Sequence, residues 1–393
     1  MPGVGGLRAP HLARLAGEGV EFPRAYASNP ASGPSRAALQ TGRYPHAVSV
    51  PWSGRQLPLA YPCLAEAFAA GGYRTGYIGK WELDGGEDPG FTPPGPRRRG
   101  YEYWAAFNRG HRYREFVYFL NDASPVRGSG FEPDHQTDLA VAFLGKPPAS
   151  PFLLCVSYGP PHGPYTVPQR QAVEVRENVP AEFAKEARAA AGGYSAMCSA
   201  VDDAIGRLLG ELDARGLARE TIVVFTSDHG EMLRSHGLEG QESWFEESAG
   251  VPLVMRWPEK IGAGTKQDWL LNNIDIAPTL RGMCGLKGLE EAQGEDRWEL
   301  IRNGGAGARP ESVYVEGALG TPGEWRMVVR GWDKLVVDRE LKATHLYNLA
   351  QDPYENENLV ENRGTIRRQE ELLALLRRWI VKAGDRVPYP GRR

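Results

Sequence analysis

A segment near the start of the chain combines small hydroxyl residues with the beginning of a predicted helix. Residues 32–43 read Ser-Gly-Pro-Ser-Arg-Ala-Ala-Leu-Gln-Thr-Gly-Arg, so Ser32 precedes a proline turn and the helix that follows it. The N-terminus of a helix presents unpaired N–H groups and the positive end of a dipole, and Arg36 adds a fixed charge. The pattern suits a nucleophile beside a dianionic ester such as sulfate or phosphate. An ordinary turn is the alternative at this point.

A second polar segment follows an apolar run. Residues Thr221–Phe225 are β-branched and almost wholly apolar, which is typical of a central parallel strand, and Asp228 and His229 come shortly after it. Ligands collect at the carboxyl ends of parallel strands, where a carboxylate beside an imidazole can bind a divalent cation. Asp-His-Gly is equally typical of an Asx-type turn. The residues alone leave both interpretations open.

Two further polar residues follow predicted strands. Lys80 comes after a short strand expected over residues 73–78, and His162 comes after a strand expected over residues 150–157. A lone histidine is more often structural, but a position just past a strand end favours a functional role.

The order and spacing of these segments resemble the type I sulfatases of the alkaline-phosphatase-like hydrolases. Residues 32–43 resemble the family signature, in which a Cys or Ser is followed by any residue, Pro-Ser-Arg and then Leu-x-Thr-Gly-Arg. Residues 79–83, 160–165 and 235–241 resemble further site motifs, and residues 347–355 resemble the closing segment. The resemblance covers nearly the whole chain.

The resemblance implies a role for each matching residue. Ser32 takes the position of the residue that a maturation enzyme oxidises to formylglycine (3-oxoalanine), whose hydrated form attacks sulfur. The implied catalytic residues are Ser32, Arg36, Lys80, His162 and His236. The implied ligands of Ca²⁺, or of another divalent cation such as Mg²⁺, are Asp228, His229 and Ser32. The expected substrate contacts are Lys80, Glu82 and Gln241.

Three features depart from the family pattern. Glu82 stands where the family has a histidine, and Gln241 stands where it has a sulfate-binding lysine. The family also begins with an apolar strand that ends in two metal-binding aspartates, and this chain as written starts after that point. We therefore expect an open gap or edge in the central sheet. We also expect weak cation binding and little turnover by the chain as written.

The predicted elements indicate how these residues are positioned. Strands separated by helices predict a doubly wound, mostly parallel sheet, and the resemblance implies the alkaline-phosphatase-like α/β fold. Helices are expected over about residues 186–212, 274–283 and 366–381. Short connections between later strands predict a small antiparallel sheet, with strands at residues 312–316, 325–330 and 334–338. We expect a catalytic α/β domain over residues 1–307 and a C-terminal subdomain, with this sheet and a closing helix, over residues 308–393.

The composition of the chain argues against several kinds of partner. The 393 residues carry 46 Lys+Arg against 49 Asp+Glu, and the resulting net charge of -3 gives no reason to expect nucleic acid or a membrane surface. The beginning as written has no signal-peptide pattern, which makes a cytosolic location the default unless the N-terminus is truncated. The four cysteines form no CxxC pair, so buried thiols are expected instead of disulfides.

These observations lead to one main hypothesis and two alternatives. The main hypothesis is a hydrolase that cleaves sulfate esters of a carbohydrate or of a small aryl or alkyl alcohol. The first alternative is a catalytically impaired sulfatase-like protein that binds anionic ligands or partners. The second is a phosphate or phosphonate ester hydrolase of the same superfamily.

Overall fold

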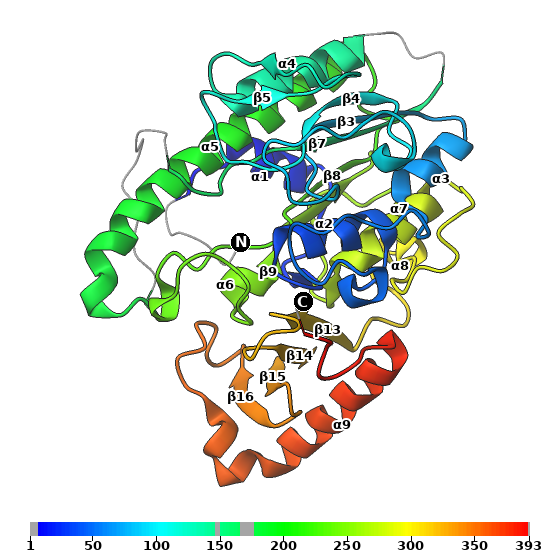
Figure 1. Ribbon diagram of the computed structural model, residues 1–393. Coiled ribbons are helices and arrows are strands. Elements are labelled where there is room, and N and C mark those ends of the chain that lie inside the picture. Colours follow the sequence, from blue (N-terminus) through cyan, green and yellow to red (C-terminus); the bar gives the residue numbers. More distant parts are fainter. Residues whose placement is uncertain (1–6, 146–149, 166–176, 392–393) are drawn as a thin grey trace.

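The larger part of the molecule is an α/β arrangement in which strands lie between layers of helices (Figure 1). The computed structural model describes residues 7–145, 150–165 and 177–391. One group of strands forms a parallel sheet in the order β4-β3-β7, with bounds Tyr103–Phe107, Arg74–Lys80 and Phe152–Ser157. The predicted α/β fold with parallel strands is confirmed.

The second group of strands has the order β11-β1-β10-β8. The bounds are Thr265–Lys266, Val20–Glu21, Leu253–Arg256 and Val223–Thr226. Strand β8 pairs with β10 in antiparallel orientation and pairs with no other strand among the described residues. The prediction that residues 221–225 form a central parallel strand is therefore wrong in its pairing, because the other edge of β8 faces a cavity.

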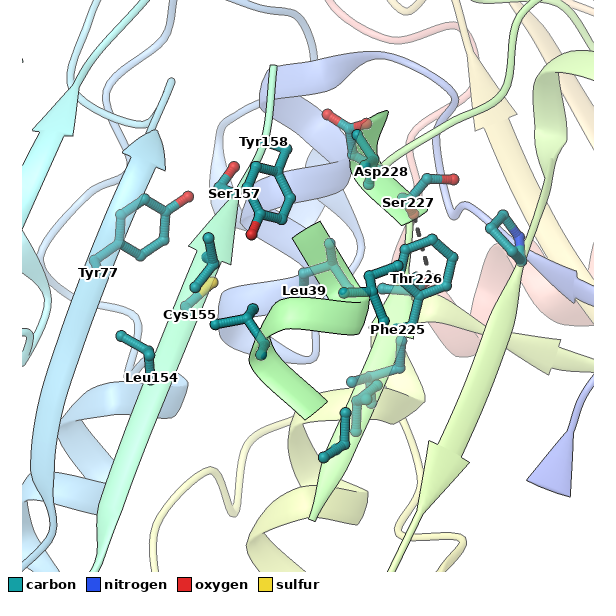
Figure 2. A pocket seen from close by; sticks show the side chains of 18 of the residues that line it. Leu39, Tyr77, Leu154, Cys155, Ser157, Tyr158, Phe225, Thr226, Ser227 and Asp228 are labelled. Atoms are coloured by element: carbon teal, nitrogen blue, oxygen red, sulfur yellow. Dashed lines mark hydrogen bonds between the residues drawn. The ribbon is translucent and has the colours of Figure 1, made fainter. Parts of the chain in front are cut away.

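That cavity has a volume of about 1180 Å³ and is lined by residues of both β7 and β8. Figure 2 shows the two strands on opposite sides of it, with Ser157 and Asp228 at the same end. The expected gap in the central sheet is thus confirmed. The candidate active-site residues lie at the end of the cavity where the two strands terminate.

Helices cover the faces of these sheets. The predicted long helix is α5 (Ala184–Ala214), and its buried Met197 and Ile205 keep the expected helical spacing. It packs against α1 (Pro10–Gly17) and α4 (Glu132–Gly145). The remaining helices of this part are α2 (Ser32–Thr41), α3 (Leu64–Ala70), α6 (Glu246–Ala249), α7 (Ile276–Met283) and α8 (Trp298–Arg302). No described helix is both long and apolar enough to cross a membrane.

The C-terminal part is a four-stranded antiparallel sheet with the closing helix α9 (Ile366–Ala383) against it. Its strands follow each other in sequence order as β13 to β16, at Ser312–Gly317, Trp325–Arg330, Asp333–Asp338 and Ala343–Asn348. The first three strands and the helix confirm the predicted elements, and β16 was not predicted. Leu335, Leu346, Leu372 and Leu376 are fully buried between the sheet and the helix.

Candidate active site

Ser32 is the first residue of α2, and its hydroxyl lies beside two polar side chains. The preceding residue, Ala31, is extended and supplies no side-chain cap, so the chain turns into the helix at Ser32. The Ser32 Oγ lies 3.0 Å from His229 Nε2 and 3.4 Å from Lys80 Nζ. Ser32 is buried except for 4% of its surface. The hydroxyl is therefore held between an imidazole and an ammonium group at the start of a helix.

Arg36 lies one helical turn further and connects the ends of three strands. Its Nε lies 2.9 Å from Asp228 Oδ2, and its Nη1 donates to the Lys80 carbonyl at 2.8 Å and to Ser157 Oγ at 2.6 Å. Burial opposes the charged form of Arg36, but Asp228 outweighs burial and raises the pKa of the guanidinium. Burial likewise opposes the charged form of Asp228, and Arg36 overcomes it and holds the pKa of the carboxyl well below its usual range. Both groups therefore remain charged.

His229 is oriented by its backbone surroundings. Its Nδ1 lies 2.8 Å from the Gly230 carbonyl and donates to it, which leaves Nε2 to face the Ser32 hydroxyl. The turn after His229 requires glycine, because a Cβ on Gly230 would lie 2.0 Å from the Glu247 carbonyl oxygen. The Asp228 carbonyl accepts from the Ser35 hydroxyl and so joins this turn to α2.

Lys80 ends β3 and is paired with a carboxylate. Its Nζ lies 2.6 Å from Glu82 Oε2, and the other carboxylate oxygen lies 3.7 Å from Arg109 Nε. Glu82 lies two residues beyond the end of β3 and has a positive φ of 61°. Burial lowers the pKa of Lys80, although the charge of Glu82 opposes this shift.

Two stacked histidines form another wall of the site. The rings of His111 and His162 lie 3.8 Å apart at an angle of 5°, and His111 Nε2 is 3.3 Å from Lys80 Nζ. The Nδ1 of His162 donates to the Gly163 carbonyl at 2.7 Å. Burial, followed by the charge of Lys80, lowers the pKa of His111 to about 3. Burial also lowers the pKa of His162, so both rings are neutral at neutral pH.

Comparison with known proteins identifies the family of the chain. The Sulfatase family model matches residues 4–286, and the C-terminal model of N-sulphoglucosamine sulphohydrolase matches residues 235–382. The chain belongs to the sulfatase family. This assignment confirms the resemblance that the motifs indicated.

Individual relatives match this sulfatase over most of its length. An ulvan-active sulfatase of Formosa agariphila is 34% identical over 398 residues, covering 96% of this chain and 77% of the relative. An endo-4-O-sulfatase of Bacteroides thetaiotaomicron is 26% identical, and the match covers 98% of this chain and 89% of the relative. The crystal structure of yidJ from Bacteroides fragilis has a TM-score of 0.90 at 26% identity, covering 98% of this chain and 92% of that one.

The nine residues expected in the site of this sulfatase do not all meet. Six of them line the cavity, namely Ser32, Arg36, Lys80, His162, Asp228 and His229. Glu82 contacts Lys80 but is not among the residues that line the cavity. His236 instead stacks on Phe245 at 3.6 Å, with its Nε2 3.0 Å from Asn178 Nδ2. Gln241 is half-buried and precedes Glu242, whose N–H donates to the Pro30 carbonyl.

The expected cation ligands of the sulfatase are too few to form a complete site by themselves. Asp228 Oδ1 lies 3.8 Å from His229 Nε2, and the hydroxyl of Ser32 is the third donor. Calcium takes about six to eight oxygen ligands and magnesium about six ligands. The other Asp228 oxygen is also engaged by Arg36. These three residues therefore fit one side of a cation and leave the rest of its coordination to other groups.

His111 is the site residue that the sequence analysis missed. No motif contains it, and it lies in the loop after β4, four residues beyond Phe107. A search for histidines shortly after a strand end would have found it, but that search required a strand at residues 103–107 that had not been predicted.

Proposed function

We propose that this enzyme hydrolyses sulfate esters of carbohydrates at the site around Ser32. The observation that carries the proposal is the Ser32 hydroxyl, which lies within hydrogen-bonding reach of both His229 and Lys80 and one helical turn from Arg36. The relatives named as an ulvan-active sulfatase and an endo-4-O-sulfatase support a carbohydrate as the alcohol part of the ester.

Residue 32 would act after oxidation. Conversion of the Ser32 CH₂–OH group to an aldehyde removes two hydrogen atoms with their electrons, which an external maturation enzyme and its oxidant would accept. Water adds to the aldehyde to give two hydroxyl groups on one carbon. One hydroxyl loses its proton and attacks sulfur, and the bond from sulfur to the alcohol oxygen breaks. Loss of the proton from the second hydroxyl then expels sulfate and restores the aldehyde.

The other side chains would bind charge and move protons in this reaction. His229 Nε2 lies beside the hydroxyl of residue 32 and is the ring nitrogen that would bind the cation, because its Nδ1 already donates to a carbonyl. Arg36 and Lys80 would hold the oxygen atoms of residue 32 and of the sulfate. Because Nδ1 of His162 donates to the Gly163 carbonyl, its Nε2 carries a lone pair; Nε2 would take up the proton that the attacking hydroxyl of residue 32 releases and pass it to the departing alcohol.

Asp228, His229 and residue 32 would supply part of the ligand set of a Ca²⁺ or Mg²⁺ ion. Such an ion would add positive charge next to the sulfate oxygens. Further ligands must complete its coordination, so we expect weak cation binding and low turnover by this chain.

A ligand-binding protein with impaired catalysis is the second candidate. The observation in its favour is the 2.6 Å ion pair between Lys80 and Glu82. An ammonium group that is already paired with a carboxylate attracts a sulfate less strongly. The two candidates therefore differ in whether bound sulfate esters are cleaved.

The test is co-expression with a formylglycine-generating enzyme, followed by assays with sulfated oligosaccharides, an aryl sulfate and the matching aryl phosphate. Each assay is run with calcium, with magnesium and with a chelator. We expect slow, cation-dependent release of sulfate that exceeds release of phosphate from the matched aryl ester. Binding without release would support the second candidate, and faster release of phosphate would support a phosphate ester hydrolase. Either result would overturn the proposal.

A further inference from the structure

A buried carboxyl group lies beside the site and has no role in the proposed reaction. Glu132 is the first residue of α4, and only 1% of its surface is exposed. Two neutral donors contact its carboxyl group, because Gln136 Nε2 lies 3.0 Å from its Oε1 and the backbone N–H of Gly159 also donates to it. Glutamates that are fully buried are usually paired with a cation, so the neutral surroundings of this one require an explanation.

Glu132 and Gln136 lie against the ends of two strands that carry site residues. Gln136 is buried and lies against the end of β3, where a Cβ on Gly79 would be 3.3 Å from Gln136 Nε2. Gly79 directly precedes Lys80. Glu132 Oε1 lies against the turn after β7, where a Cβ on Gly159 would be 3.0 Å from it. The two side chains therefore bridge the end of β3 and the turn that follows β7.

Tyr113 connects Glu132 to His162 by a second route. The Glu132 N–H donates to the Tyr113 carbonyl at 2.8 Å, and the Tyr113 hydroxyl donates to the His162 carbonyl at 2.7 Å. The Tyr113 ring also covers Gly159, since a Cβ there would lie 2.8 Å from Tyr113 Cε1. Glu132 thus holds the segment 159–162 through both its side chain and its main chain.

The hydrogen bonds around Glu132 favour its protonated form. Gln136 Oε1 is buried and has no hydrogen-bond partner among the described residues. An ionised Glu132 offers this oxygen no donor, whereas a protonated Glu132 carries an O–H group next to the amide. Leaving a buried acceptor unpaired is unfavourable. Burial also raises the pKa of Glu132 to about 8, although its two amide donors and the charge of Lys80 oppose the shift.

The neighbouring elements present few titratable groups to Glu132. Lys80 of β3 is the charged side chain that acts on it among the described residues, and Tyr113 faces it from the loop after β4. Burial, followed by the charge of Glu132, raises the pKa of the Tyr113 hydroxyl, which stays neutral. On the side of α5, the cluster around Tyr113 contains Ala196 and Met197, which do not titrate. A change in the charge of Glu132 therefore acts mainly on Lys80.

We propose that Glu132 is a positioning residue of the site, which in its protonated form holds the end of β3 and the turn after β7 so that Lys80 and His162 are placed. An ionised Glu132 would leave Gln136 Oε1 without a donor and would add a negative charge that competes with sulfate for the ammonium group of Lys80. Both effects weaken sulfate binding and turnover as the pH rises through ~8. The effect on turnover rests on the proposed function, whereas the effect on sulfate binding does not require hydrolysis.

The experiment compares the parent with Glu132→Gln, which resembles the protonated group at every pH. An infrared difference spectrum between the two proteins should show the carbonyl band of a protonated carboxyl group at pH ~7, and this band should be lost by pH ~10. Calorimetry with inorganic sulfate should give similar affinities at pH ~7 and an affinity at least ~3-fold weaker for the parent at pH ~9. Asp134→Asn, at an exposed position of the same helix, is the control and should match the parent at both pH values.

Turnover provides a further readout after co-expression with a formylglycine-generating enzyme. The kcat/KM of the parent relative to Glu132→Gln should fall ~10-fold between pH ~7 and pH ~9, because the protonated fraction of Glu132 falls by about that factor. Glu132→Met is also neutral but lacks the hydrogen bonds. It should be less active at every pH and should likewise lack the fall that the parent shows, so it replaces Glu132→Gln if that variant does not fold.

Three outcomes decide between the positioning role and its alternatives. A missing carbonyl band, or a ratio of sulfate affinities that is the same at both pH values, would overturn the inference. A deficit of Glu132→Gln that is constant across the pH range would also overturn it, because it would show a purely structural role. If the infrared and sulfate results are as expected but the parent releases no sulfate from esters, the proposed hydrolysis fails and the role of Glu132 stands.

Discussion

The C-terminal sheet and the Ser32 site both contain buried ion pairs, but they differ in what those pairs face. In the C-terminal part, Lys334 is fully buried between Glu246 and Glu355, at 3.0 and 2.7 Å. In the site, Arg36 and Lys80 are also paired with carboxylates, yet both line the cavity beside the Ser32 hydroxyl. Neither Lys334 nor any other residue of β13 to β16 lines that cavity. A buried charge therefore indicates function only where a cavity and a reactive group accompany it.

The largest expected effect concerns the structural role of Arg326. It is fully buried, ion-paired with Asp385, and 3.1 Å from a Glu324 oxygen. Arg326→Met would remove the guanidinium that neutralises these buried carboxylates, and we expect a loss of about 3–5 kcal/mol in the free energy of unfolding. Urea denaturation of the parent and the variant measures this free energy of unfolding. The control is Arg367→Met, whose side chain is 92% exposed and pairs with Glu371; we expect a change below ~1 kcal/mol there. Equal losses in both variants would contradict the comparison.

The second prediction concerns the pH dependence of stability at His46. Burial opposes protonation of His46, but Glu316, 2.5 Å away, outweighs burial and raises the pKa of the imidazole from 6.5 to about 9. A raised pKa in the folded state stabilises below pH ~6.5, and the stabilisation is lost as the pH rises through ~9. The pKa difference corresponds to about 3 kcal/mol at most. The difference in unfolding free energy between the parent and His46→Gln should therefore shrink between pH 6 and pH ~10; a difference independent of pH would contradict this account.

The third prediction concerns the affinity for sulfate. Glu82→Gln removes the negative charge beside Lys80 while keeping the shape of the side chain. We expect about tenfold tighter binding of inorganic sulfate at pH ~6, or about 1.4 kcal/mol. Because burial lowers the pKa of Lys80, the gain should shrink at higher pH as Lys80 loses its proton. Isothermal calorimetry measures the affinity, and the exposed Glu102→Gln serves as the control. Unchanged or weaker binding by Glu82→Gln would show that Glu82 does not limit the site.

The smallest expected effect concerns His111. His111→Ala removes the ring that stacks on His162 and the contact with Lys80. We expect a fall of about 5-fold in kcat/KM, or about 1 kcal/mol, and a shift in the pH profile as His162 becomes more accessible to water. His111→Gln keeps a polar partner for Lys80 and should recover part of the loss. A fall in kcat/KM without any change in the pH profile would assign His111 a purely structural role.

The sequence predicted those elements best whose residues repeat at a regular spacing. The apolar positions of α5 and of α9 recur at helical intervals, and both helices lie where they were expected. Strands β13 to β15 were predicted on other grounds, as strands joined by short connections. Strand β16 was missed, because Ala343–Asn348 mixes threonine, histidine and asparagine with only a few apolar residues. The pairing of β8 was also not predictable, since an apolar strand beside a cavity has the same composition as one between two strands.

The motifs predicted which residues meet in the site, but they did not predict the contacts of residues with an unusual backbone conformation. Ser32, Arg36, Asp228 and His229 meet at the ends of their elements, as expected from their positions. Glu82, which contacts Lys80, has a positive φ that glutamate rarely adopts, and no pattern in the sequence indicates this conformation. His236 has the expected motif around it, but its own left-handed backbone conformation, with a φ of 54°, accompanies its stacking on Phe245.

The most direct test of the central claim examines Ser32 itself. The chain is co-expressed with a formylglycine-generating enzyme, and mass spectrometry of the peptide that carries residue 32 is combined with measurement of sulfate released from a sulfated oligosaccharide. Ser124→Ala, at an exposed loop position, is the control for Ser32→Ala. We predict an aldehyde at residue 32, slow sulfate release by the parent and by Ser124→Ala, and no release by Ser32→Ala. Sulfate release that persists in Ser32→Ala would contradict the assignment of Ser32 as the nucleophile position.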